Sequence, residues 1–278
     1  MTSPIRTARA LAGASHPGPT LAITTITVLL GVASGLEIWR IIVLGLAMAT
    51  GQVSVGLSND WIDADRDRAV GRRDKPVARG DIPAAIARNA AFVSLTLAIV
   101  LTIPLGGWAL ACHVIFICCA WAYNAGIKGT ALSVAPYLLA FGLLPALVTL
   151  ARPEPHLPPG WIVAAAALLG AGAHFANVLP DLGDDAATGV RGLPHRFGGR
   201  VSLVVTWIAF VGAGVCLALA IGIPTPLGAV ALILSLAIGA IGIAVGSRGV
   251  GRATFALLIA GALVDVVLLL VAGSRILG

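Results

Sequence analysis

The stretch Val201–Gly222 reads VSLVVTWIAFVGAGVCLALAIG and contains no charged side chain. A helix needs about 20 apolar residues to cross the hydrocarbon core of a bilayer, so this stretch alone predicts a membrane-spanning helix. The apolar sequence then continues to residue 273, divided only by Pro224, Pro226 and residues 247–252. Three spans therefore fit between residues 201 and 273.

The rest of the chain has a similar composition. Of its 278 residues, 58% are hydrophobic and 11% are charged. Soluble domains carry about 25% charged residues, and disorder requires low hydrophobicity, so both classes are excluded. The net charge of +6 fits basic residues that flank spans and meet anionic membrane lipid. No soluble module remains to bind nucleic acid. The sequence predicts an all-α polytopic membrane protein in one domain, residues 1–278.

Windows of about 19 residues predict nine transmembrane helices. Proline and glycine interrupt the apolar sequence between several of them, for example at Pro104 and in the run Arg152–Gly160. The predicted spans are 20–36, 40–58, 83–104, 107–125, 132–150, 161–180, 201–222, 226–246 and 253–273.

Lysine and arginine lie in alternate loops between these spans. With a cytoplasmic N-terminus, 15 of the 18 basic residues are cytoplasmic, and only Arg40, Arg152 and Arg275 lie on the other side. We therefore expect nine helices with the N-terminus inside and the C-terminus outside. The first segment also resembles a signal peptide after Arg6 and Arg9, but its removal would leave eight helices whose Arg-rich loops still require an inside start.

A first group of carboxylates follows the second predicted span. Residues Asn59–Asp67 read NDWIDADRD. On a continued helix, Asp60, Asp63 and Asp67 share one face, and Asn59 lies a turn from Asp63. Like charges at this spacing repel one another, so they persist only where they are solvated, paired with cations or bridged by a metal ion.

A second group, Asp181–Asp185 (DLGDD), follows the sixth predicted span at the same cytoplasmic depth. Asp181 and Asp185 are four residues apart and share a helix face, with Asn177 one turn earlier. Either group alone is compatible with ordinary solvated loop carboxylates. Two groups with helical spacing at one membrane face favour a site for Mg²⁺, which binds through carboxylates and substrate phosphates.

Cationic side chains accompany both acidic groups. Arg72, Arg73, Lys75 and Arg79 follow the first group, Arg191 follows the second, and Tyr123 and Lys128 end the fourth span. Metal ions and cationic side chains at one mouth are what a diphosphate leaving group requires, because both neutralise its developing charge. The sequence therefore predicts a diphosphate-ionising site that faces the cytoplasm.

These motifs resemble those of the UbiA superfamily of intramembrane prenyltransferases. Asn59-Asp60-x-x-Asp63-x-x-x-Asp67 is similar to the first aspartate-rich motif of the family, and Asp181-x-x-x-Asp185 to the second. The loop Arg72–Gly80 is similar to the Arg-x-x-x-Arg-Pro-Leu-x-Ser-Gly loop, with Lys75 at an arginine position and Arg79 at a serine position. The segment Gly189–Arg191 is similar to a Gly-x-Lys/Arg stretch.

The resemblance implies a nine-helix bundle around a central cavity, with Mg²⁺ bridging carboxylates and the diphosphate of a polyprenyl donor. Ionisation then gives an allylic carbocation that a lipophilic acceptor captures. Asp60, Asp63, Asp67, Asp181 and Asp185 would be the catalytic carboxylates. The implied metal ligands are these five together with Asn59 and Asp184, and the implied diphosphate-binding residues are Asn59, Arg72, Lys75, Tyr123, Lys128 and Arg191. Tyr123 and Lys128 are five residues apart, where the commonest family spacing is four.

Aromatic side chains and buried polar residues complete the expectations. A cation must form where water cannot reach it, against apolar or aromatic walls. The candidates are Trp61, Trp121, Tyr137, Phe141 and Phe175, each of which is also compatible with a lipid-facing or interfacial anchor. Polar residues inside the spans are functional candidates or packing groups, and they are Asp265, His113 and His174.

Two other functions remain open. A terpene cyclase on the same scaffold would use the same ionising residues and would need no acceptor. A transporter or channel places its polar residues near the bilayer midplane, whereas the carboxylates here lie at one mouth. The acceptor and the donor chain length are undetermined. Two lysines against sixteen arginines favour a GC-rich bacterial genome, and hence a bacterial cell membrane with the active site facing the cytoplasm.

Overall fold

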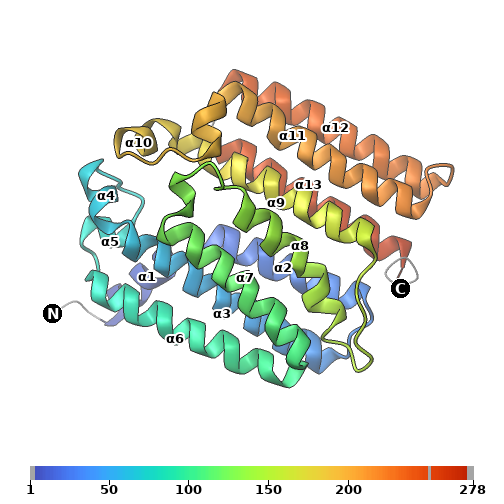
Figure 1. Cartoon of the computed structure of the whole chain (residues 1–278), viewed down its shortest axis with the longest axis horizontal. Coiled ribbons are helices and arrows are strands. Elements are labelled where there is room, and N and C mark those ends of the chain that lie inside the picture. Colours follow the sequence, from blue (N-terminus) through green and yellow to red (C-terminus); the bar gives the residue numbers. More distant parts are fainter. Residues whose placement is uncertain (1–3, 250–251, 274–278) are drawn as a thin grey trace.

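The computed structural model describes residues 4–249 and 252–273, and this part of the chain is helical without any strand. Figure 1 shows the helices packed side by side as one bundle. The α-helices are α1 (Pro4–Ala14), α2 (Pro17–Ala33), α3 (Ile38–Ile62), α4 (Ala64–Ala69), α5 (Pro76–Arg79), α6 (Ala84–Thr102), α7 (Gly107–Ala125), α8 (Ala135–Thr149), α9 (Gly160–Val178), α10 (Leu182–Ala187), α11 (Leu193–Ile221), α12 (Pro226–Arg248) and α13 (Arg252–Ala272). Three 3₁₀ turns connect them, η1 (Ile103–Leu105), η2 (Ile127–Gly129) and η3 (Leu179–Asp181).

The polytopic membrane fold predicted from the sequence is confirmed. Within the described residues, seven helices are long and apolar enough to span a membrane, and α1 and α2, bent by 64°, would make an eighth span together. Helix α8 has 15 residues and is shorter than these. The count of nine spans and the cytoplasmic N-terminus therefore remain predictions, and Arg275 lies outside the described residues.

Helix α8 begins later than the predicted span 132–150 because the residues before it are used for hydrogen bonds between helices. Residues 131–134 form turns. The Ser133 hydroxyl oxygen accepts the Leu193 N–H at 2.8 Å and lies 3.0 Å from His174 Nε2. These contacts join the starts of α8 and α11 to α9, next to the second acidic group.

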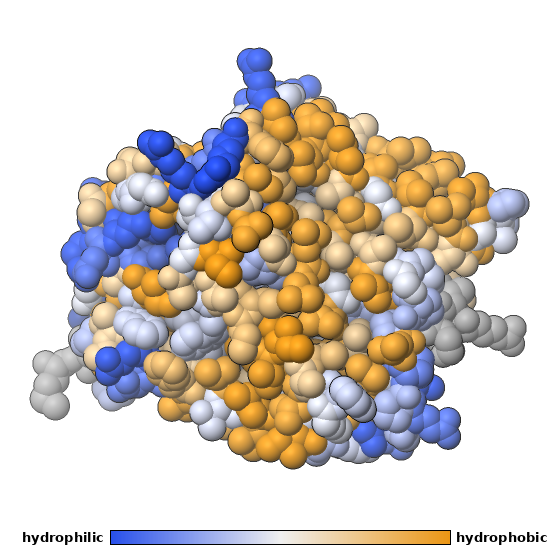
Figure 2. Space-filling model, in the orientation of Figure 1, coloured by the Kyte–Doolittle hydropathy of each residue, from blue (hydrophilic) through white to orange (hydrophobic). Residues whose placement is uncertain are grey.

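The bundle closes around a central space. Helix α3 packs against α6, α9 packs between α8 and α11, and α13 packs against α2 and α9. Glycine permits the close contact of α11 with α12, because a Cβ atom on Gly242 would overlap the Trp207 ring. Figure 2 shows one face of the molecule, much of which is apolar. The exposed large hydrophobic side chains of the bundle include Phe92, Leu97 and Ile233. This surface suits contact with lipid.

The short polar elements gather at one end of the bundle. Figure 1 shows α1, α4, α5 and α10 at this end, and the connections from α2 to α3 and from α8 to α9 at the opposite end. Helix α3 runs to Ile62, and η3 ends at Asp181. Both acidic groups are thus carried to the same end of the bundle, as the sequence predicts.

Candidate active site

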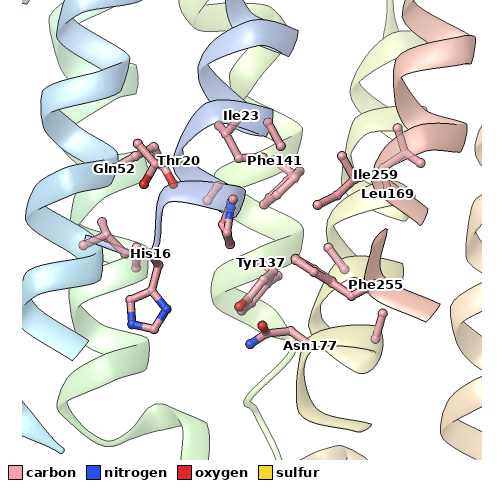
Figure 3. A pocket seen from close by; sticks show the side chains of 18 of the residues that line it. His16, Thr20, Ile23, Gln52, Tyr137, Phe141, Leu169, Asn177, Phe255 and Ile259 are labelled. Carbon is pink, nitrogen blue, oxygen red and sulfur yellow. The ribbon is translucent and has the colours of Figure 1, made fainter. Parts of the chain in front are cut away.

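A cavity of about 720 Å³ runs into the bundle from the end that carries the acidic groups. Polar side chains, among them Asn59, Asp63 and Asp185, line its mouth, and apolar side chains such as Ile23 and Leu269 line its inner part. The lining residues of α13 run from Phe255 to Leu269, which is about 20 Å along a helix. Figure 3 shows His16 and Asn177 near the mouth, with Phe141 and Leu169 deeper. The space combines a charged entrance with an apolar chamber.

The first acidic cluster consists of Asp60, Asp63 and Asp67, whose exposed fractions are 1%, 4% and 2%. Asp60 lies in the last turn of α3, Asp63 follows that helix, and Asp67 lies in α4. The predicted shared face is therefore formed across a helix junction. Three carboxylates buried this deeply require cationic partners.

Lys75 and Lys128 supply charge to this cluster. Lys75 Nζ donates to Asn59 Oδ1 at 2.8 Å and lies 2.9 Å from Asp67 Oδ2 and 3.7 Å from Asp60 Oδ1. Lys128 Nζ donates to Asp63 Oδ1. Burial lowers the pKa of the Lys128 ammonium, and the adjacent Asp63 carboxylate partly offsets this effect. The structure thus brings both predicted lysines to the first acidic cluster.

The second acidic cluster, Asp181 and Asp185, faces the first across the mouth, and each of its carboxylates has an arginine partner. Arg72 Nη1 lies 3.2 Å from Asp181 Oδ2. Hydrogen bonding to Asp74 and the charge of Asp181 raise the pKa of Arg72, so its guanidinium stays charged. Arg66 Nη2 lies 3.0 Å from Asp63 Oδ2 and 3.8 Å from Asp185 Oδ1. Side chains from both clusters therefore belong to one charged network.

Three predicted site residues do not line the cavity. One of them, Asp67, is buried beside it, with Oδ2 2.9 Å from Lys75 Nζ. Asp184 and Arg191 are exposed, and neither lines the cavity. Asp184 lies one position before Asp185 on α10, and one residue turns a helix by about 100°, so it faces solvent while Asp185 faces the mouth. Arg191 lies in the connection that precedes α11.

Sequence reasoning missed Arg66 and Asn124. Arg66 stood inside the first motif, but its contacts with Asp63 and Asp185 depend on tertiary folding. The Asn124 amide donates to Val55 O and Ser58 Oγ and accepts from Asn59 Nδ2 at 3.2 Å. Asn124 thereby fixes the side chain of Asn59, which accepts a hydrogen bond from Lys75. The one available signal was an amide inside an apolar span.

Replacing Arg66 with glutamine tests the network at its centre. Because Asp63, Asp185 and Asp67, which lies 3.9 Å from Arg66 Nη2, then lose a cation, we expect the free energy of unfolding to fall by about 1–3 kcal/mol in the absence of divalent metal. Arg68→Gln is the matched control, since Arg68 pairs at the surface with Asp65 and such pairs contribute little. Equal thermal midpoints for the two variants in detergent would contradict this role.

Aromatic rings from α7 and α8 line part of the cavity wall. Tyr123, Tyr137 and Phe141 line the space. Tyr123 meets Tyr137 edge to face with ring centroids 5.1 Å apart, and Tyr137 stacks on Phe141 at 6.1 Å. Of the five predicted wall residues, Tyr137 and Phe141 lie in the cavity lining, and the others, Trp61, Trp121 and Phe175, do not.

The three polar residues inside spans have different surroundings. His113 Nδ1 lies 2.7 Å from Thr102 Oγ1, and His174 bonds to Ser133, so both are buried packing histidines outside the cavity lining. Asp265 lines the cavity and is 7% exposed, and its Oδ2 atom has no hydrogen-bond partner. Only Asp265 meets the ligand space.

The carboxylates at the mouth suit a hard divalent cation. Asp60 Oδ1 is buried without a hydrogen-bond donor, and carboxylate oxygens are the ligands that Mg²⁺ prefers. Among residues 4–249 and 252–273, no three acidic, histidine or cysteine side chains are already close enough to hold a metal ion. Lys75, Lys128 and Arg66 lie against the carboxylates instead. The donor set fits a metal that is brought in with an anionic ligand.

The charges at the mouth explain why the metal ion and the anionic ligand would bind together. Five carboxylates of the two clusters face four cations, Arg66, Arg72, Lys75 and Lys128. A diphosphate alone would meet carboxylates whose charge outweighs that of the cations. A divalent ion would convert those carboxylates from repulsive neighbours into ligands. The arrangement can therefore bind a metal–diphosphate with an apolar chain in the chamber below.

Comparisons with known proteins agree with this geometry. A UbiA homologue from Archaeoglobus fulgidus, solved bound to GPP and Mg²⁺, has a TM-score of 0.74 at 15% sequence identity, covering 95% of this chain and 99% of that chain. The apo structure of a UbiA homologue from Aeropyrum pernix K1 has a TM-score of 0.74 at 16% identity, covering 91% and 98%. At this identity, these similarities show the fold.

A curated relative and a family model extend the comparison to sequence. The bacteriochlorophyll synthase 33 kDa chain of Rhodobacter capsulatus is 28% identical over 193 residues, 62% of this chain and 61% of the relative. The chain thus spans about three fifths of that relative's length. The model described as the UbiA prenyltransferase family matches residues 19–254. Because this match covers most of the chain, the protein belongs to the UbiA prenyltransferase family.

Proposed function

We propose that this protein transfers a prenyl group from an allylic polyprenyl diphosphate to a lipophilic acceptor, aromatic or another lipid precursor, in a Mg²⁺-dependent reaction. The single observation that carries the proposal is the pair of acidic clusters joined by Arg66 at the mouth of an apolar cavity. Relatives support it, because the A. fulgidus homologue was solved with GPP or DMAPP and Mg²⁺.

The proposed site assigns the diphosphate to the mouth and the prenyl chain to the chamber. Asp60, Asp63 and Asp67 would hold one metal ion with Asn59, and Asp181 and Asp185 would hold a second. Bound Mg²⁺ would neutralise the charge that develops on the departing diphosphate. We leave Asp184 and Arg191 out of this site because both are exposed outside the cavity.

The protein's own cations would receive the leaving group. Lys75, Lys128 and Arg72 line the cavity mouth and already bind carboxylates there, so they need only exchange a carboxylate oxygen for a diphosphate oxygen. Tyr123 lines the same mouth and can donate its phenol hydrogen to that oxygen. These charge-assisted hydrogen bonds strengthen as the allylic carbon–oxygen bond breaks.

The remaining steps depend on the chamber. The electron pair of the breaking bond leaves with the diphosphate, and the acceptor forms a bond to the allylic carbon and loses a proton. Tyr137 and Phe141 line the wall below the mouth, where aromatic faces can stabilise a carbocation and apolar walls exclude water. The products are the prenylated acceptor, diphosphate and a proton.

We further propose that the protein is a multi-pass protein of a bacterial cell membrane with this site facing the cytoplasm. Fifteen of eighteen basic residues fall on the acidic side of the predicted topology, which is the cytoplasmic side by the positive-inside rule. The acceptor stays open. The relatives' names describe different enzymes, a bacteriochlorophyll synthase chain and a digeranylgeranylglyceryl phosphate synthase.

Product analysis tests this function. Purified protein is incubated with geranyl diphosphate, Mg²⁺ and a lipid extract of the source membranes, and the products are identified by mass spectrometry. We expect a compound whose mass equals that of the acceptor plus one geranyl group minus one hydrogen atom. This compound should be absent when the enzyme is left out. A cyclised hydrocarbon formed without any extract would instead show a terpene cyclase and contradict the transferase assignment.

A further inference from the structure

His16 lies at the break between α1 and α2 and has an unusual backbone. Among residues 4–249 and 252–273 it is the one non-glycine residue with a positive φ, with φ 52° and ψ 66°. L-residues with side chains rarely adopt this left-handed conformation, and it is retained mainly where the surrounding structure imposes it. The surrounding structure therefore holds His16 in a strained backbone conformation.

The backbone around His16 is fixed from three directions. Thr20 N–H donates to His16 O at 3.1 Å, and the Thr20 hydroxyl donates to Ser15 O at 2.8 Å. Ser15 packs directly on Gly56 of α3, where a Cβ atom would overlap the Ser15 backbone. The break is thus seated on the same face of α3 that carries Asp60, because Gly56 and Asp60 are four residues apart.

The imidazole faces the ligand space and has no hydrogen bond at its inner nitrogen. His16 lines the cavity, and Figure 3 shows its ring across the space from Asn177. Its Nε2 atom lies 3.6 Å from Asp60 Oδ1. Both atoms are buried and lack a hydrogen-bond partner. A nitrogen and a carboxylate oxygen from two elements are therefore held just beyond hydrogen-bond distance.

Only certain groups satisfy both atoms at once. A carboxylate oxygen only accepts hydrogen bonds, whereas a neutral imidazole presents one donor and one acceptor. A hydroxyl can donate to Asp60 and accept from an imidazole N–H. A carboxylate ligand would be repelled by the negative charge of Asp60. A hydrocarbon would leave His16 Nε2 and Asp60 Oδ1 without hydrogen bonds.

The position of His16 favours the acceptor over the donor diphosphate. The four cations contact Asp63, Asp67, Asp181 and Asp185, and Lys75 Nζ also lies 3.7 Å from Asp60 Oδ1. In the part of the chain that the structure describes, the charged group within ion-pair distance of His16 is Asp60. From His16, the cavity lining continues along α2 to Ile23 and Ile26. An apolar body could lie along α2 with its hydroxyl at the mouth.

We propose that His16 Nε2 and Asp60 Oδ1 bind a hydroxyl group of the acceptor, so that the acceptor is a phenol, enol or alcohol and His16 helps to determine that specificity. The Asp60 carboxylate has about four lone-pair sites, so it can accept the hydroxyl hydrogen and still serve as a ligand of the metal ion proposed at this cluster. This inference rests on the proposed prenyl transfer and extends it to the acceptor class. It assigns a function to the strained residue between α1 and α2.

Binding of a matched pair of probes tests this proposal without turnover. Detergent-solubilised full-length protein, loaded with Mg²⁺ and geranyl S-thiolodiphosphate, is dialysed against 1-naphthol or 1-methoxynaphthalene. We expect the parental protein to bind 1-naphthol about tenfold more tightly than the methyl ether, because the ether cannot donate to Asp60. Equal affinity for the two probes in the parental protein would overturn the proposal.

Two substitutions separate the side chain from the backbone. His16→Gly removes the imidazole and suits a positive φ, so the variant should fold, with a thermal midpoint at or above the parental value. We expect it to lose the preference for 1-naphthol. His16→Asn tolerates the same backbone and keeps a side-chain donor, and should restore part of that preference. His156→Gly, in the connection between α8 and α9 at the opposite end of the bundle, is the control.

The donor analogue shows which substrate His16 serves. We expect geranyl S-thiolodiphosphate to bind the parental protein and His16→Gly within about twofold of each other. Weaker binding of this analogue with an unchanged preference for 1-naphthol would place His16 on the donor and overturn the proposal. Pyrophosphate release from geranyl diphosphate, measured separately in the parental protein, tests the proposed function itself, so the two failures are distinguishable.

Discussion

Replacing Asp63 with asparagine is expected to reduce the rate of pyrophosphate release from geranyl diphosphate about 10²- to 10³-fold, the usual effect of removing one group that stabilises charge in a transition state. Asp63 is the most connected carboxylate of the site. It accepts from Asn59 and Arg66 at 3.0 Å each and from Lys128. Asparagine keeps its size but removes the charge needed to bind a metal ion and to hold these cations.

The acidic motif Asn59–Asp67 also contains a residue that serves as a matched control. Asp65 is exposed and pairs with Arg68 at the surface, so Asp65→Asn should keep the parental rate within about twofold. Both variants should elute as the parental protein does in size-exclusion chromatography in detergent. If Asp63→Asn retained more than about a tenth of the parental rate, Asp63 would not be part of the ionising site.

Replacing Lys75 with glutamine should produce the largest loss of stability. Lys75 is 7% exposed, and its ammonium group lies among Asn59, Asp60 and Asp67. Removing one partner from a buried ion pair costs roughly 3–5 kcal/mol, because the remaining charge is left without compensation. We expect the thermal midpoint of Lys75→Gln in EDTA to fall clearly below the parental value.

Mg²⁺ distinguishes this electrostatic effect from a simple packing defect. Metal bound to the carboxylates would replace the missing ammonium charge, so Mg²⁺ should raise the midpoint of Lys75→Gln more than that of the parental protein. Arg79→Gln is the control, since Arg79 is exposed and pairs with Asp81. An equal response of the parental protein and Lys75→Gln to Mg²⁺ would contradict the assignment of these carboxylates to metal binding.

Much of the fold was predictable because the spans are long and apolar. Each predicted span overlaps a helix of the structure. The boundaries were wrong where polar residues change the path of the chain. Helix α3 continues past residue 58 into the acidic motif, and α11 begins at Leu193 and has a non-helical residue, Gly198, at φ 77°. Hydropathy alone does not register such extensions.

The site was predictable where helical spacing determines it and unpredictable where tertiary contacts do. The i, i+3 and i, i+4 patterns brought Asp60, Asp63, Asp181 and Asp185 to one mouth. Spacing could not indicate that Arg66 contacts Asp185, or that His16, which precedes the first predicted span, lies next to Asp60. Those contacts depend on how α2, α3 and α10 are placed in the bundle. The assignment of residues 1–278 to one domain stays a prediction.

The dependence of pyrophosphate release on divalent metal tests most directly whether the two acidic clusters form a metal-dependent, diphosphate-ionising site. Purified parental protein in detergent is given geranyl diphosphate with Mg²⁺, or with EDTA, and pyrophosphate is quantified over time. We expect steady release with Mg²⁺ and a rate with EDTA that is indistinguishable from the protein-free control, because the five carboxylates of the two clusters then repel the diphosphate. Equal release under the two conditions, or none with Mg²⁺, would contradict this expectation.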